Sequence, residues 1–187
     1  MRKSFGLFTL LLMLSACGSV SEEQTVPEGF EVPQGVELTA PLAELELGQT
    51  ATWIATPAND SPTILVGSVN DVINGEIKDF FGFAIGETTK NSQPVYVNLQ
   101  VRNGGPEALN EYSLPIYADV NGSEILPPLA IKGPFNPCQV RELPTQFNSG
   151  TSSELCLVYL IPQGQKLAAM RLVLNEEQYL TWQVAQQ

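Results

Sequence analysis

The strongest constraint on the fold is the alternation of apolar and polar residues in PVYVNLQVRNGG, residues 94–105. Val95, Val97, Leu99 and Val101 occupy every second position of this stretch. Successive side chains of a β-strand point to opposite faces of a sheet, so this period predicts a strand with one buried face. Asn103-Gly104-Gly105 then supplies residues that tolerate a positive φ, and it is expected to end the strand.

Similar apolar stretches separated by turn residues recur from about residue 45. They predict further strands at residues 50–55, 63–73, 76–85, 113–120, 123–131, 154–161, 168–174 and 178–184. Asn74-Gly75 is expected to form a hairpin between the second and third of these, and Asn121-Gly122 between the fourth and fifth. No 12-residue window shows helical periodicity. The pattern predicts an all-β chain, an antiparallel sandwich of about seven to nine strands.

The N-terminus has the order of features of an export signal. Arg2 and Lys3 precede an apolar run of ten residues, Phe5 to Leu14, whereas a membrane-spanning helix needs roughly 20. The following Leu14-Ser15-Ala16-Cys17 resembles a bacterial lipobox, in which the cysteine receives a diacylglycerol and becomes the first residue of the mature chain. Residues 1–16 are therefore predicted to be a lipoprotein signal peptide and Cys17 a lipidation site. The alternative is an ordinary secretory signal that carries a cysteine after its small residues.

Residues 17–44 are predicted to link the lipid to a domain at residues 45–187. Seven acidic residues and no basic one lie between Gly18 and Glu46, and prolines occur at 27, 33 and 41. Proline and like charge both extend a chain, so the part up to about Pro41 is expected to be a flexible tether.

Cysteine use agrees with export. Once Cys17 is assigned to lipid, only Cys138 and Cys156 remain, and in an oxidising compartment they are expected to form a structural disulfide. A redox-active pair is the alternative. It would be unusual here because the chain has no Cys-x-x-Cys motif and no histidine to activate a thiol.

Charge and the absence of histidine limit the chemistry. The chain has 9 basic and 20 acidic residues, and removal of residues 1–16 takes away two basic residues and no acidic one, which leaves a net charge of −13. Nucleic acid is therefore not expected as a partner. Catalytic triads and imidazole metal sites are excluded because there is no histidine. We predict no catalytic residue, no metal site and no cofactor.

Two clusters remain as candidate sites. Phe80, Phe81 and Phe83 would lie on both faces of a strand, so they are either core residues or an exposed aromatic patch. The acidic clusters, Glu107 with Glu111 and Asp71 with Glu76 and Asp79, do not follow the spacing of a calcium loop, and we interpret them as solvated turns.

Three motifs carry a family resemblance: LGQTATW at 47–53, PVYVNLQVRNGG at 94–105 and CLVYLIPQGQKL at 156–167. With them, the chain resembles bacterial surface lipoproteins that have a single immunoglobulin-like domain of unknown function, related in fold to a secreted immunoprotective antigen of mycobacteria. The resemblance spans about Leu45 to Val184. TPANDSPT at 56–63 and PPLAIKGPFNPC at 127–138 depart from it. Since the family has no agreed activity, the resemblance implies an immunoglobulin-like sandwich and an extracytoplasmic location, and no site.

Together these observations predict a non-catalytic binding or interaction module, anchored by the lipid on Cys17 to the cell membrane, or to the outer membrane of a two-membrane organism. Its partner would be an envelope protein or glycan. The alternatives are an accessory structural lipoprotein of a larger membrane assembly and a carboxylate-dependent hydrolase of envelope glycans, which would need two converging acids.

Overall fold

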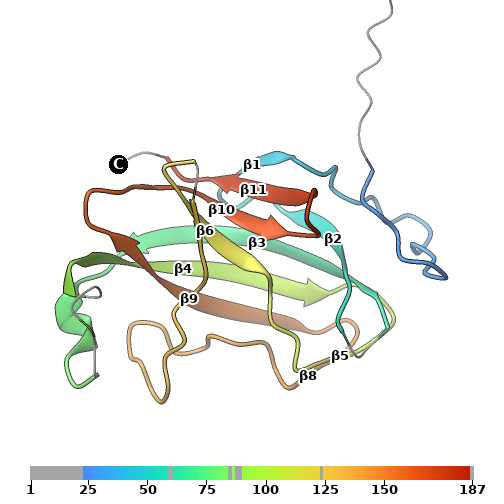
Figure 1. Ribbon diagram of the computed structural model, residues 1–187. Coiled ribbons are helices and arrows are strands. Elements are labelled where there is room, and N and C mark those ends of the chain that lie inside the picture. The colour runs from blue at the N-terminus through green and yellow to red at the C-terminus, as the bar shows by residue number, and fades with distance from the viewer. Residues whose placement is uncertain (1–22, 59–60, 84–85, 87–89, 123, 186–187) are drawn as a thin grey trace, which may run out of the picture.

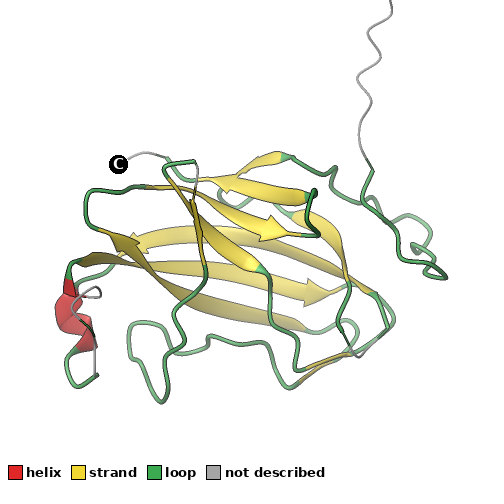
Figure 2. Ribbon diagram, in the orientation of Figure 1, coloured by secondary structure: helices red, strands yellow, loops and turns green. Residues whose placement is uncertain are grey.

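The computed structural model describes residues 23–58, 61–83, 86, 90–122 and 124–185. These residues form eleven strands and a short 3₁₀ helix, η1, at Ile77–Phe80, and the strands stack as two layers (Figures 1 and 2). The strands are β1 Glu44–Glu46, β2 Ala51–Ala55, β3 Thr63–Asn74, β4 Ser92–Asn103, β5 Leu109–Asn110, β6 Ile116–Val120, β7 Glu124–Leu126, β8 Gln146–Phe147, β9 Ser152–Pro162, β10 Leu167–Val173 and β11 Tyr179–Gln183. Within the described part of the chain, no helix is long and apolar enough to cross a bilayer.

Two sheets make up the sandwich. One has the order β1-β11-β10-β6-β7 and the other β2-β3-β4-β9, while β5 and β8 form a separate short pair. All strand pairs are antiparallel except β1 with β11. The prediction of an all-β sandwich is confirmed. The strand number is higher than expected because β1, β5 and β8 have only two or three residues, too few for a periodic pattern.

The core lies between the two sheets, where the alternating side chains predicted for residues 94–102 point inward. Val95, Val97, Leu99 and Val101 are each at most 3% exposed. They belong to one cluster with Met170, Leu172 and Trp182 of the other sheet. Burial of a side chain of this size stabilises the fold by about 1.5–3 kcal/mol. The Tyr159 hydroxyl donates a hydrogen bond to the Ile116 carbonyl at 3.0 Å and so joins β9 to β6 across the core.

The prediction of a hairpin at Asn74-Gly75 between residues 63–73 and 76–85 is wrong. β3 pairs with β4 instead, with Asn74 opposite Val95, and residues 76–85 do not form the predicted strand, since η1 occupies 77–80. Gly75 has a different role from a turn glycine. A Cβ atom there would lie 2.5 Å from the Tyr96 ring, so only glycine lets the backbone pass this ring.

The two other turn predictions have different outcomes. Asn121-Gly122 joins β6 to β7, with φ of 53° and 71°, which confirms that hairpin. β4 does end at Asn103, yet the glycines that follow do not have positive φ. A Cβ atom on Gly105 would lie 2.2 Å from the Thr63 hydroxyl oxygen, so a close backbone approach accounts for glycine at that position.

The segment expected to be a tether up to Pro41 is attached to the domain at Gln24 and Thr25 and again at Thr39. The Gln24 side chain is 5% exposed and lies at the outer edge of β2. Its amide nitrogen donates to the Thr39 and Thr52 carbonyls at 2.7 and 2.9 Å, and its oxygen accepts the Ile54 N–H at 3.1 Å. These bonds satisfy backbone groups that an edge strand would otherwise leave open, which is why the segment docks despite its charge and prolines.

Candidate functional site

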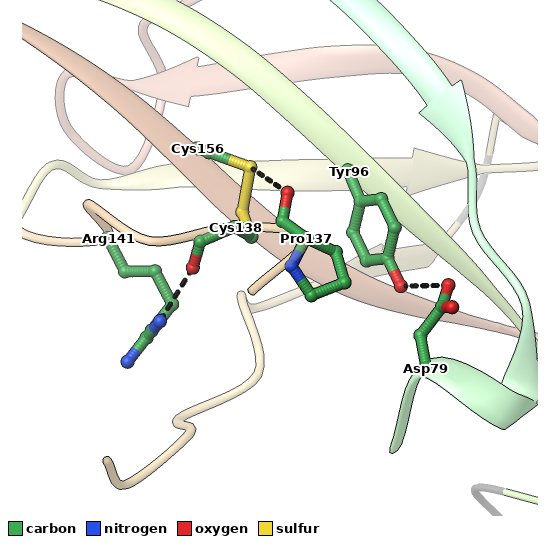
Figure 3. The surroundings of a disulfide bond; sticks show 6 residues. All are labelled: Asp79, Tyr96, Pro137, Cys138, Arg141 and Cys156. Carbon is green, nitrogen blue, oxygen red and sulfur yellow. Dashed lines mark hydrogen bonds between the residues drawn. A yellow bond between two sulfur atoms is a disulfide. The ribbon is translucent and has the colours of Figure 1, made fainter. Parts of the chain in front are cut away.

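The disulfide expected between Cys138 and Cys156 is confirmed, with a Cα–Cα distance of 5.2 Å (Figure 3). It ties the long loop between β7 and β8, residues 127–145, to β9, the outer strand of its sheet. Two backbone hydrogen bonds join the same partners: Leu129 N–H donates to the Val158 carbonyl and Cys156 N–H to the Val140 carbonyl, both at 2.7 Å. The loop therefore covers the edge of β9 and is fixed to it by three connections.

Arg141 organises this loop from within. Its guanidinium donates to the carbonyls of Cys138 at 2.6 Å, Gly133 at 2.7 Å and Ile131 at 3.4 Å. All three acceptors are neutral, and among the ion pairs of the described residues none involves Arg141. The loop thus contains a cation that forms no ion pair within the described part of the chain.

Of the two alternatives for Phe80, Phe81 and Phe83, a shared exposed patch is ruled out by the structure, because only Phe81 among them is strongly exposed, at 95%. Phe80 is 2% exposed and packs against Phe135 with ring centroids 4.9 Å apart. Phe83 also contacts Phe135, at 5.5 Å. The reason is local: the turn that follows η1, closed by a hydrogen bond from the Phe83 N–H to the Phe80 carbonyl at 2.9 Å, brings both rings to Phe135. A strand would have placed Phe80 and Phe83 on opposite faces.

A hydrogen bond fixes η1 to β4. The Tyr96 hydroxyl donates to the Asp79 carboxylate at 2.8 Å (Figure 3), and the Glu76 N–H donates to the same oxygen at 2.9 Å. The bond from the Glu76 amide, and then that from Tyr96, lower the pKa of Asp79. Burial, and next Asp79, raise the pKa of Tyr96. Asp79 is thus held by structural bonds, and Glu76 forms an ion pair with Lys78 at 2.6 Å.

No acidic cluster of the described residues is suited to a metal: none brings together three or more aspartate, glutamate, cysteine or histidine side chains around one position. The carboxylate of Asp71 accepts a hydrogen bond from the Val72 N–H at 2.9 Å.

A groove with a volume of about 410 Å³ lies between the disulfide loop and β9, and we call it the loop groove. Its lining is Tyr112, Ser113, Leu114, Pro128, Leu129, Ala130, Ile131, Lys132, Arg141, Glu142, Leu143, Leu155, Leu157 and Val158. Leu143, Leu155 and Leu157 belong to the main core cluster, so the floor of the groove is continuous with the core. Small-molecule sites commonly have volumes of about 300–1,000 Å³ and mostly apolar walls.

Polar groups are few in the loop groove. Lys132, Arg141, Glu142, Ser113 and the Tyr112 hydroxyl are its polar side chains. Burial raises the pKa of Tyr112 to about 12, so its hydroxyl remains protonated at neutral pH. Glu142 is the single acid among the described residues that line the groove, whereas glycoside hydrolysis generally uses two carboxylates.

The sequence did not predict this groove. Its walls come from four segments, residues 112–114, 128–132, 141–143 and 155–158, that are far apart along the chain. The one feature of the sequence that pointed to this groove was the pair Cys138 and Cys156, because their disulfide brings the long loop to β9. Cys17, the predicted lipidation site, lies outside the described residues.

Comparison with known proteins gives one informative likeness. A crystal structure of MPT63, a secreted protein from Mycobacterium tuberculosis, matches with a TM-score of 0.53 and 14% identity, covering 76% of this chain and 97% of that one. At this identity the match establishes the sandwich fold alone. No protein-family model matches the chain. No curated protein matches it either.

Proposed function

We propose that this protein is a non-catalytic binding module of the cell envelope, exported and held at the membrane by a lipid on Cys17. The observation that carries the proposal is the loop groove, a concavity of about 410 Å³ whose floor is apolar and whose shape is fixed by a disulfide. A ligand loses less entropy on binding to a preformed site of this kind than to a mobile loop. The export signal, the lipobox and the disulfide support an extracytoplasmic location.

The proposal is tested with a photo-reactive side chain inside intact cells, where no detergent competes for the groove. p-Benzoylphenylalanine replaces Ser113, an exposed residue of the groove wall, and in a control protein it replaces Ala40, an exposed residue that does not line the groove. Irradiation followed by mass spectrometry is expected to show an adduct at position 113 and none of the same mass at position 40.

A second variant establishes that the groove itself binds. Ala130→Trp places a large side chain at an exposed position of the groove wall and is expected to abolish the adduct, while Ala40→Trp leaves it unchanged. Equal labelling at positions 113 and 40, or an adduct that persists in the Ala130→Trp protein, would show that the groove is not the binding site.

A further inference from the structure

The charges of the loop groove differ in sign from those of the rest of the molecule. After removal of residues 1–16, the chain has seven basic and 20 acidic residues. Two of the seven, Lys132 and Arg141, line the groove, against a single acid, Glu142. The groove is therefore a locally cationic site on a strongly anionic protein, and it is complementary to an anion.

Arg141 and Lys132 differ in how freely their charged groups can contact a ligand. Arg141 is half-buried and its donors already reach three loop carbonyls, yet these acceptors carry no charge to balance it. Lys132 is exposed and takes part in none of the ion pairs recorded within the described ranges. An anionic group of a ligand, placed at the end of the groove that Lys132 and Arg141 form, would lie near both charges. It would not first have to break an ion pair.

The remainder of the groove suits hydrocarbon. Leu155 and Leu157 on β9, with Leu143 and Leu129 from the loop, form apolar walls. The backbone groups of the loop nearest β9 already have hydrogen-bond partners: the Leu129 N–H donates to the Val158 carbonyl, and the Val140 carbonyl accepts from the Cys156 N–H. A buried peptide would need main-chain partners for its own amides, and unpaired amides are costly to bury. An alkyl chain has no such requirement.

We infer that the loop groove binds a single-chain amphiphile with a carboxylate head, in the manner of a fatty acid. The alkyl chain lies against Leu155 and Leu157, and the carboxylate lies at the end formed by Lys132 and Arg141. This inference rests on the proposed binding function and specifies its ligand class. A neutral or cationic amphiphile of equal length gains the same apolar contact and lacks the charge attraction.

The test compares three probes with the same twelve-carbon chain: dodecanoate, dodecanol and dodecyltrimethylammonium, each titrated below its micellar concentration into residues 18–187 by calorimetry. Dodecanoate is expected to bind roughly tenfold more tightly than dodecanol, since a hydrogen bond to a charged group contributes about 1.5–3 kcal/mol. Dodecyltrimethylammonium is expected to bind more weakly than dodecanol. Acetate is expected not to bind, because it has no chain.

Two charge reversals locate the head group. Lys132→Glu changes an exposed groove side chain and is expected to abolish the preference for dodecanoate over dodecanol. Lys166→Glu makes the same charge change at an exposed position outside the loop groove and is expected to preserve that preference. Arg141 is left intact because its loss would release the loop.

The outcomes separate this inference from the proposed function. Equal binding of all three probes, absence of dodecanoate binding, or an unchanged preference in Lys132→Glu would overturn the carboxylate amphiphile. In each of these cases an adduct at position 113 that Ala130→Trp abolishes would still support a groove ligand of another class, an acidic peptide among them. Loss of that adduct would remove the binding function itself.

Discussion

At the scale of single residues, polar side chains hold irregular segments on the sandwich. Gln24 fixes the N-terminal segment at the edge of β2, Arg141 gathers three carbonyls of the disulfide loop, and Tyr96 holds η1 through Asp79. Each of these segments has little regular structure to satisfy its own backbone. A side chain that bonds backbone groups provides what a sheet neighbour would otherwise supply.

Gln24→Ala is expected to lower the free energy of unfolding by about 1–3 kcal/mol, because it removes three hydrogen bonds to backbone groups at a sheet edge. Urea denaturation measures the change. Gln34→Ala, at an exposed glutamine of the same segment, is the control and is expected to be neutral. If the two variants are equally stable, residues 24–39 do not dock in solution.

Gly75→Ala is expected to destabilise the protein because its Cβ atom would lie 2.5 Å from the Tyr96 ring, in a region where β4 fixes the ring. Overpacking of this kind costs about 1–3 kcal/mol. Gly86→Ala serves as a control, since a Cβ atom there meets nothing within 4 Å and the φ of Gly86 is not positive. Thermal unfolding distinguishes them, and a Gly75→Ala midpoint equal to that of Gly86→Ala would contradict the close approach.

Three tyrosines are expected to make the fold sensitive to alkali. Burial raises the pKa of Tyr96, Tyr112 and Tyr159, that of Tyr112 to about 12. An unfolded tyrosine loses its proton near pH 10, whereas these stay protonated in the fold, so above about pH 10 the unfolded state gains stability. Stability should be constant from pH 8 to 9.5 and fall from pH 10 to 12.

Urea midpoints measured across this range test the prediction. Tyr112→Phe removes one of the three buried hydroxyls, so the urea midpoint of this variant is expected to fall less steeply between pH 10 and 12. A midpoint that is independent of pH up to 11 would show that these hydroxyls ionise equally in both states.

At the scale of elements, the loop between β7 and β8 depends on covalent and hydrogen-bonded attachment. It lies over the edge of β9 at the lower part of Figure 1, and it packs through Phe135 on η1 and Tyr96. The disulfide, the two backbone bonds and this aromatic cluster act together to shape the loop groove.

Replacement of both Cys138 and Cys156 by serine is expected to lower the free energy of unfolding by about 3 kcal/mol, the value for a loop of this length, since the sequence separation is 18. Chemical denaturation measures it. Dithiothreitol should destabilise the natural protein to a similar extent and leave the double variant unchanged. We also expect the double variant to lose groove-dependent labelling at position 113, because both cysteines hold the wall in place.

At the scale of the whole molecule, the predicted lipid site at Cys17 is close along the chain to the first described residues of the domain. Cys17 precedes Glu23 by six residues, and the Glu23 carbonyl accepts a hydrogen bond from the Gln178 side chain at 3.0 Å. Six residues span at most about 20 Å, so a lipid on Cys17 would hold the domain near the bilayer by the side that carries Gln178. The N-terminal segment and the disulfide loop lie on different sides of the molecule in Figure 1.

Cys17→Ser is expected to prevent acylation, which leaves the precursor unprocessed or releases the protein from membranes. Labelling with radioactive palmitate and fractionation of membranes measure both effects. Ser19→Ala is the control and should keep the label and the membrane location. Unchanged labelling of the Cys17→Ser protein would refute lipidation at this residue.

Four features could be predicted from the amino-acid sequence: the fold class, most of the long strands, the Asn121-Gly122 hairpin and the cysteine pair. These depend on short-range signals: a period of two, a turn that tolerates positive φ, and the count of remaining thiols. The roles of Gly75 and Phe80 and the position of Gln24 could not be predicted in this way, because each depends on a neighbour that is distant in sequence and is brought close by folding. The same holds for the loop groove. Its walls come from four segments, and its cations meet an apolar floor only when the loop closes over β9.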